Sequence, residues 1–185
     1  MAKAKATIVK TTKVLVGTMP LTQINVTTIM KQAGLRRQTF YDYYRDKFDV
    51  LGDIYRTEID ADVWYCGDYR RWPQTVHAML TYFDANRDFY RQALQLDEQN
   101  APETYIRAHL EEMCRTILRD LQHAEQLTLP ADYQQFLAAA MADMSLGVLR
   151  RFLLATPAEP VATVERHLST LIADNLAGLK ARTGH

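Results

Sequence analysis

The sequence has few of the residues that hold small secreted or fibrous proteins together. Its 185 residues include only two cysteines, Cys66 and Cys114, which lack a C-x-x-C spacing. Two thiols cannot staple a fold of this size, so we expect both to be reduced in the cytoplasm. Only seven glycines and six prolines occur, which excludes a collagen-like or low-complexity protein.

Long apolar runs are also absent. The longest stretches, such as residues 136–142, fall far short of the roughly 20 apolar residues that a membrane span needs. Lys3 and Lys5 are followed by Thr7 and Lys10 rather than by an apolar core, so we expect no cleavable signal peptide. A chain with 48% apolar residues and balanced charge is not disordered either. We therefore predict a folded cytoplasmic protein with no membrane partner.

The usual signatures of catalysis and metal binding are missing. No Gly-rich phosphate loop and no G-x-S-x-G motif occurs, and Cys114 and His109 are five residues apart and would not share a helix face. We predict that the protein is not an enzyme and uses no cofactor or metal. The histidines show no H-E-x-x-H or other metal-ligand spacing: His77, His109, His123, His167 and His185.

Positive charge is present but unevenly distributed. The whole chain is neutral, with 22 Lys/Arg and 22 Asp/Glu. The first 50 residues, however, contain nine Lys/Arg and three Asp, a surplus of six positive charges that the remaining residues offset. A basic N-terminal segment on an acidic remainder points to nucleic acid or another anionic surface as the partner.

Apolar residues recur at helical spacing along the chain, and no segment alternates as a strand would. We predict an all-α protein of about nine helices, divided where the charge changes sign into an N-terminal domain over 1–46 and a helical domain over 47–185. The helices are expected at about 8–19, 26–33, 36–44, 47–64, 72–85, 87–96, 101–126, 130–154 and 161–181.

Residues 25–44 are arranged as a helix-turn-helix, with the sequence N-V-T-T-I-M-K-Q-A-G-L-R-R-Q-T-F-Y-D-Y-Y. Asn25 can cap the first helix, and Gly34 can end it as a left-handed turn residue. In this motif the second helix enters the major groove with its N-terminal residues against the base edges. The motif therefore predicts a three-helix domain that binds double-stranded DNA.

The second helix of the motif begins with four polar side chains suited to this role. Arg36 and Arg37 lie where the helix dipole disfavours cations, and no acid precedes them. Duplex phosphate can supply the missing anion, and Arg can also bond guanine O6 and N7. Gln38 can pair with adenine, and Thr39 can bond phosphate or touch a thymine methyl.

The aromatic residues of this helix are expected to divide between core and surface. Phe40 and Tyr44, at i and i+4, would face the core, whereas Tyr41 and Tyr43 lie off that stripe with hydroxyls able to reach phosphate. Asp42 lies one turn after Gln38. It can accept from cytosine N4, orient Arg45 or Arg37, or balance charge while pointing away from DNA.

The stretch A-G-L-R-R-Q-T-F-Y-D-Y-Y-R-D-K, followed by Val50 and Leu51, resembles the TetR family signature A-G-V-S-x-x-T-[LF]-Y-x-[HY]-F-x-x-K-x-x-L. The resemblance covers about residues 8–52 and implies a transcription regulator. Arg36 replaces the family's usual small N-cap, and Met19–Pro20 replaces a common Gly-aromatic pair. The resemblance implies DNA contacts by Thr27, Arg37, Gln38, Thr39, Tyr41 and Tyr43, and a phosphate contact by Lys47 with the first-turn amides of the fourth helix.

Two more blocks, L-T-Y-F-D-A-N-R-D-F-Y (80–90) and S-L-G-V-L-R-R-F-L (145–153), together with R-R-Q-T-F-Y-D-Y-Y, resemble a Firmicutes-type branch of this family. That branch includes the activator of dihydroxyacetone kinase operons. The resemblance implies an effector related to dihydroxyacetone, which is sensed through a kinase-like coactivator protein or bound directly as a small molecule.

The domain over 47–185 is expected to sense the effector and form a homodimer, because one short recognition helix reads too few base pairs. The candidate dimer helices are 130–154, with Ala138, Ala139, Ala140, Ala142 and Gly147, and 161–181, with Val161, Val164, Leu168, Leu171, Leu176 and Leu179. Intramolecular packing of the same faces is the alternative. Bulky residues that either line a pocket or form ordinary core are Trp64, Trp72, Met79, Tyr82, Phe83, Phe89, Tyr90, Met113, Phe136, Met141 and Met144.

These patterns predict a homodimeric, sequence-specific DNA-binding regulator that acts on a palindromic operator, and the resemblance adds control of dihydroxyacetone or glycerol metabolism genes. The alternative is a helical protein–protein interaction module without sequence-specific DNA binding. Such a module has no reason to keep R-R-Q-T on a short helix after a glycine turn. The residues do not distinguish an activator from a repressor.

Overall fold

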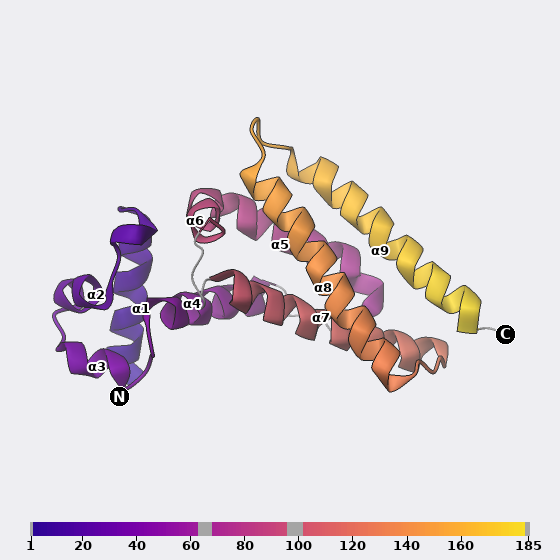
Figure 1. The fold of residues 1–185 in the computed structure, drawn as a ribbon, viewed down its shortest axis with the longest axis horizontal. Coiled ribbons are helices and arrows are strands. Elements are labelled where there is room, and N and C mark those ends of the chain that lie inside the picture. The colour runs from indigo at the N-terminus through magenta and orange to yellow at the C-terminus, as the bar shows by residue number, and fades with distance from the viewer. Residues whose placement is uncertain (1, 63–67, 96–101, 184–185) are drawn as a thin grey trace. The chain divides into compact units, whose positions relative to one another are not determined.

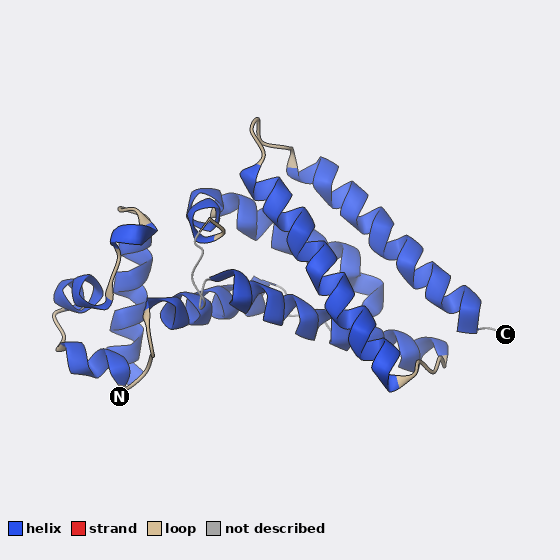
Figure 2. Ribbon diagram, in the orientation of Figure 1, coloured by secondary structure: helices blue, strands red, loops and turns tan. Residues whose placement is uncertain are grey.

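The structure is a computed structural model that describes residues 2–62, 68–95 and 102–183. Over these ranges it contains nine α-helices, two short 3-10 turns (Leu21–Gln23 and Tyr69–Arg71) and no strand, which confirms the all-α prediction (Figures 1 and 2). The α-helices are α1 (Ala2–Val16), α2 (Val26–Ala33), α3 (Arg37–Tyr41), α4 (Lys47–Asp62), α5 (Trp72–Ala85), α6 (Arg87–Ala93), α7 (Pro102–Glu125), α8 (Ala131–Leu154) and α9 (Val161–Thr183).

The chain forms two compact units. One comprises Met1–Glu58 and Asp88–Tyr105, and the other comprises Ile59–Arg87 and Ile106–His185. The first compact unit therefore contains more of the chain than the predicted domain over 1–46. It also includes most of α4, α6 and the first turn of α7. Our division of the chain at residues 46 and 47 stays a prediction about function.

Two helices end earlier than expected, although α1 also begins earlier, at Ala2. α3 ends at Tyr41, not near Tyr44, because the amides of Tyr43 and Tyr44 both donate to the carbonyl of Phe40 and tighten the chain into a turn. Likewise α1 ends at Val16, and the amides of Gly17 and Met19 continue only as a turn. The expected ends of two helices, Trp64 and Leu96, lie outside the described residues.

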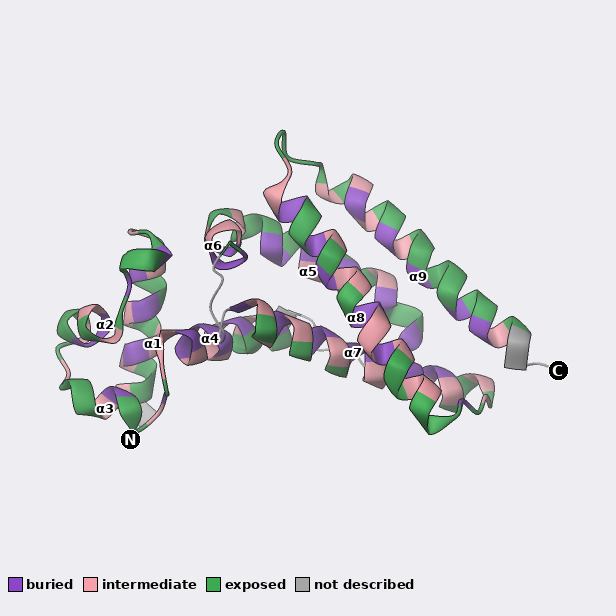
Figure 3. Ribbon diagram, viewed as in Figure 1, coloured by how far each residue is buried: buried purple, intermediate pink, exposed green. Residues whose placement is uncertain are grey.

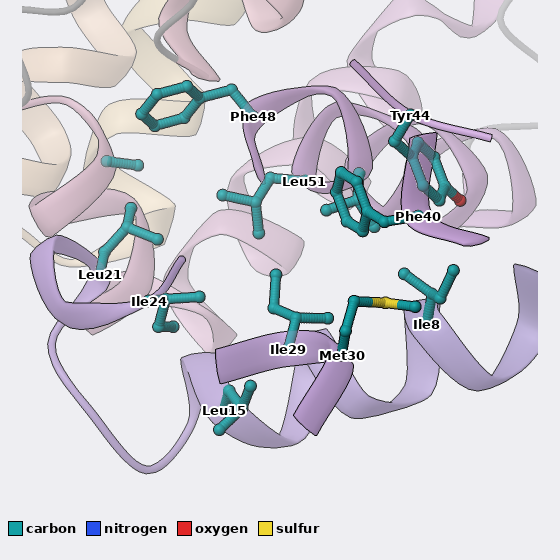
Figure 4. Close-up of a cluster of buried hydrophobic side chains, with 12 residues drawn as sticks. Ile8, Leu15, Leu21, Ile24, Ile29, Met30, Phe40, Tyr44, Phe48 and Leu51 are labelled. Carbon is teal, nitrogen blue, oxygen red and sulfur yellow. The ribbon is translucent and has the colours of Figure 1, made fainter. Parts of the chain in front are cut away.

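The first unit is built around an apolar core that α1, α2, α3 and α4 share (Figure 4). Phe40 is 0% exposed and Tyr44 is buried, as their i, i+4 spacing predicts. Burying side chains of this size contributes roughly 1.5–3 kcal/mol each to folding. The buried members of the core are Ile8, Leu15, Leu21, Ile24, Ile29, Met30, Phe40, Tyr44, Phe48, Val50, Leu51 and Ala93.

Polar contacts join α1 to α4 inside this unit. The ammonium of Lys5 lies 3.0 Å from Oδ2 of Asp53, and Lys13 pairs with Glu58. The hydroxyl of buried Tyr44 donates to the same carboxylate of Asp53 over 2.6 Å. Two lysines of the basic N-terminal segment are therefore neutralised by acids of α4.

The second unit contains α5, α7, α8 and α9, each of which alternates buried and exposed positions (Figure 3). Arg87 donates to the carbonyls of Phe152 (2.7 Å) and Leu153 (3.3 Å) in the last turn of α8. Arg115 pairs with Glu111 on α7, as their i, i+4 spacing predicts. None of the described helices meets the length and apolarity that crossing a membrane requires.

Candidate nucleic-acid interface

The turn between α2 and α3 is fixed by local capping. The side chain of Asn25 accepts from the amide of Thr28 over 3.0 Å, which begins α2. Gly34 ends α2 in the left-handed region, with φ 66° and ψ 28°, and the amide of Leu35 reaches back to the carbonyl of Met30. This is the glycine-ended C-cap that the sequence predicts.

The polar start of α3 faces outward, opposite buried Phe40. Arg36, Arg37 and Gln38 are exposed, and Thr39 is half-buried. Arg36 is the N-cap residue, but its side chain makes no capping hydrogen bond and no acid occupies the first turn. Thr27 is exposed on α2, the helix that packs against α3. The first turn of α3 is therefore a cationic helix N-terminus without a compensating anion.

The two tyrosines assigned to phosphate differ in their surroundings. Tyr41 is 44% exposed, and its hydroxyl accepts a 3.2 Å hydrogen bond from Nη2 of Arg37. Tyr43 is only half-buried but packs against the apolar core of the first unit.

Lys47 and two of the first-turn amides of α4 make hydrogen bonds within the chain. Oδ1 of Asp46 accepts from the amides of Phe48 (2.8 Å) and Asp49 (3.0 Å), so a carboxylate already occupies two of the first-turn amides expected to bind phosphate. Lys47 is half-buried, and its ammonium donates to the carbonyl of Leu21 over 3.4 Å. A phosphate contact by Lys47 stays a prediction.

The possible partners of Asp42 are bound elsewhere. The backbone amide of Arg45 donates to Oδ2 of Asp49 over 3.1 Å, and the hydrogen bond and charge of Asp49 raise the pKa of the Arg45 guanidinium. Arg37 donates to Tyr41 instead of to Asp42. An orienting role of Asp42 toward either arginine is therefore not what the structure contains.

Lys31 is a candidate DNA contact that the sequence alone indicates only as one of the nine Lys/Arg in the first 50 residues. It is exposed in the last turn of α2, one turn after Thr27, and it makes no ion pair with any described residue. Its i, i+4 spacing from Thr27 is the signal that would have identified it. Lys31, Thr27 and the start of α3 supply the polar surface of the helix-turn-helix.

The basic surplus is smaller for the whole compact unit than for the first 50 residues. Residues 51–58 and 88–105 add six acids but only two arginines. The whole unit therefore contains eleven Lys/Arg and nine Asp/Glu. The positive field is therefore not a property of the whole unit. It is carried by exposed cations such as Lys10, Lys31 and Arg36, which pair with no acid among the described residues.

The second unit contains an apolar cavity of about 60 Å³. Five of the eleven bulky residues that the sequence suggests for a pocket or core line this cavity. Of the others, Phe89 and Tyr90 belong to the first unit and Phe136 is 66% exposed. Trp64 lies outside the described residues. The lining side chains are Trp72, Thr75, Val76, Met79, Leu80 and Phe83 of α5, Leu110, Met113, Cys114 and Ile117 of α7, Met141, Ser145 and Leu149 of α8, and Leu168 and Ile172 of α9.

Most of the apolar residues assigned to the dimer interface pack within the chain. On α9, Val164, Leu168, Leu176 and Leu179 are buried in the second unit. These four are core residues, so the intramolecular alternative holds for them. Leu171 is 40% exposed, and on α8 Gly147 is exposed.

Comparison with known proteins identifies the C-terminal part of the chain. Residues 70–174 match a TetR-type family model described as a transcriptional regulator C-terminal region. An activator of the dhaKLM operon in Lactococcus lactis, DhaS, is 33% identical over 76 residues. That match spans 41% of this chain and 41% of DhaS, less than two thirds of the relative's length.

Two solved structures have the same fold. A dihydroxyacetone kinase operon activator, DhaS, aligns with a TM-score of 0.67 and 22% identity over 98% of both chains. FadR from Thermus thermophilus, a TetR-family repressor in complex with lauroyl-CoA, aligns with a TM-score of 0.70 and 18% identity over 91% of this chain and 93% of that one. Because the family model covers more than half of its length, the chain belongs to the TetR family of transcriptional regulators.

Proposed function

We propose that the protein is a cytoplasmic homodimer that binds a palindromic DNA operator through α2 and α3. The observation that carries this proposal is the exposed first turn of α3, where Arg36, Arg37 and Gln38 meet no compensating anion. An uncompensated breach of a local rule is expected at functional sites, and duplex phosphate supplies the missing charge. The interaction-module alternative leaves this turn unexplained.

The residues divide into two roles in this proposal. Arg37 and Gln38 lie at the helix end that enters the groove, so they read base edges. The remaining contacts fix the position of the protein on the backbone without reading sequence. We assign them to Thr27, Arg36, Thr39, Tyr43 and Lys47, and we add Lys31, which is exposed on α2.

Dimerisation follows from the size of the recognition helix. α3 has five residues, and a helix this short contacts too few base pairs to select one operator in a genome. Two copies related by a two-fold axis read half-sites about 34–36 Å apart or a multiple of it. We place the dimer contact on the outer faces of α8 and α9, where Gly147 and Leu171 remain exposed.

The effector is expected either to bind directly or to be sensed through a kinase-like coactivator protein, and the lining of the cavity favours the coactivator. Its polar side chains are few: the hydroxyl of Thr75 already donates to the carbonyl of Arg71, which leaves Ser145 as the main polar group. A triose such as dihydroxyacetone would leave its oxygens without hydrogen-bond partners there, which costs roughly 1–3 kcal/mol for each group. We therefore propose that the protein controls genes of dihydroxyacetone or glycerol metabolism, and that it senses dihydroxyacetone by binding a kinase-like partner protein and not by binding the sugar itself.

Selection of bound DNA from a random duplex library tests the proposal. We expect recovery of a palindrome whose half-sites are separated by one helical turn or a multiple. A variant with both Arg37→Ala and Gln38→Ala should recover no such palindrome while it remains folded by circular dichroism. Recovery of no palindrome by the wild-type protein would refute the proposal and favour the interaction module.

A further inference from the structure

Arg37 and Tyr41 are the first and last residues of α3, and their side chains contact each other. Nη2 of Arg37 donates to the hydroxyl of Tyr41 over 3.2 Å, and the guanidinium carbon lies 5.9 Å from the centre of the tyrosine ring. The two residues are at i and i+4, the spacing that brings side chains together on one helix face. The pair therefore spans the whole recognition helix.

Tyr41 is in turn anchored to the core. Its ring meets the ring of Phe40 edge-on, with centroids 5.7 Å apart and an interplanar angle of 79°. Phe40 is 0% exposed and belongs to the apolar core of the first unit. The guanidinium of Arg37 is thus connected to the rigid core through one exposed ring. The side chain of the neighbouring Arg36 makes no hydrogen bond or ion pair with any described residue.

We propose that Tyr41 is a positioning residue, which holds the guanidinium of Arg37 in the orientation that reads DNA. This inference rests on the proposed function, and it assigns Tyr41 a task different from the phosphate contact expected from the sequence. An unrestrained Arg side chain loses rotamer freedom when it binds, and a side chain that is already held loses less. The hydrogen bond uses one N–H of the guanidinium and leaves enough others for two parallel bonds to guanine.

The two tasks of Tyr41 lead to different measurable results. A phosphate contact is insensitive to sequence, so its loss weakens all operators alike and adds to the loss of Arg37. A positioning contact acts through Arg37, so its loss lowers discrimination only at the base pair that Arg37 reads. In that case the effect of removing the Tyr41 hydroxyl disappears once Arg37 is already absent.

A double-mutant cycle of Tyr41→Phe and Arg37→Ala separates these tasks. The substrates are the selected operator and its single-base variants, with dissociation constants measured by fluorescence anisotropy at one fixed salt concentration. Tyr41→Phe keeps the ring and removes only the hydroxyl. We expect it to lower discrimination at one base pair by roughly 2- to 10-fold, the range that one net hydrogen bond supplies. In the Arg37→Ala background, we expect Tyr41→Phe to change that discrimination by less than about 1.5-fold.

Arg36→Ala combined with Tyr41→Phe is the matched control, because Arg36 has no contact with Tyr41 and the two effects should multiply. Equal losses on every operator variant, multiplicative effects of Tyr41→Phe and Arg37→Ala, or no effect of Tyr41→Phe would each overturn the proposal. None of these results would change the finding that the wild-type protein selects an operator, so the proposed function would still stand. A wild-type protein that selects no operator would overturn both.

Discussion

The aromatic ring of Tyr105 lies directly against the backbone of Gly52. A Cβ atom at position 52 would be 2.6 Å from Cδ1 of that ring, closer than any side chain tolerates. The hydroxyl of Tyr105 donates to Oδ1 of Asp49 over 3.3 Å, and the other oxygen of Asp49 accepts from the amide of Arg45. The first turn of α7 is thereby joined to the segment that follows α3.

Gly52→Ala should therefore destabilise the protein. The ring of Tyr105 must move away, which breaks its hydrogen bond to Asp49, and overpacking of this kind costs roughly 1–3 kcal/mol. Urea unfolding measures the loss. Gly17→Ala is the matched control in the same unit, because the nearest atoms to its Cβ are at 3.7 Å. In a Tyr105→Ala background, Gly52→Ala should become neutral or stabilising, and a cost that persists there would contradict the explanation.

Lys31 and Lys13 should differ in their effect on DNA affinity although both are lysines of the basic segment. Lys31 has no acidic partner among the described residues, whereas Lys13 pairs with Glu58 of α4. Lys31→Ala should weaken binding to all sequences and reduce the slope of log K against log salt by about one. Lys13→Ala should leave that slope unchanged. Equal slopes for the two variants would show that the pairing does not decide which lysine meets phosphate.

The cavity of the second unit should bind an apolar molecule and not a triose. Three methionines in its wall, Met79, Met113 and Met141, have flexible side chains that allow it to enlarge. A ligand that binds only the folded state raises the melting temperature. We expect benzene to do so and dihydroxyacetone at the same concentration to have no effect. Ser145→Leu, which fills part of the cavity, should abolish the benzene effect, and stabilisation by dihydroxyacetone would refute the assignment.

The parts of the fold that depend on local signals follow from the sequence. Asn25 and Gly34 delimit α2, and Trp72 begins α5 at the expected residue, because caps and prolines act within one turn. The contacts that join distant residues do not follow from it. Tyr105 and Gly52 are brought together only by packing, and so are Lys47 and the carbonyl of Leu21.

The candidate site divides in the same way. The exposure of Arg36, Arg37 and Gln38 follows from the helical period and the buried position of Phe40. The hydrogen bond between Arg37 and Tyr41 has the right spacing, but it also requires particular side-chain rotamers that no sequence pattern specifies. The occupied first-turn amides of α4 are instead a local signal, because Asp46 stands just before the helix and can cap it as Asn25 caps α2.

The stability of the first unit should fall at alkaline pH because of Tyr44. Burial, and then the hydrogen bond to Asp53, raise the pKa of the Tyr44 hydroxyl well above its usual value. In the unfolded chain a tyrosine ionises near pH 10. The contribution of Tyr44 is therefore complete below about pH 10 and is lost as the pH rises from there toward the higher pKa of the folded state.

Tyr44→Phe tests this, because phenylalanine cannot ionise. Below about pH 9 the wild-type protein should be the more stable one by roughly 0.5–3 kcal/mol, the range for one hydrogen bond to a neutral or charged acceptor. Above pH 10 its free energy of unfolding should fall more steeply than that of the variant, by as much as about 1.4 kcal/mol per pH unit. Urea unfolding of both proteins between pH 8 and pH 11 measures the difference. Parallel curves over that range would mean that the hydroxyl of Tyr44 ionises as readily in the folded protein as in the unfolded chain, against its burial beside Asp53.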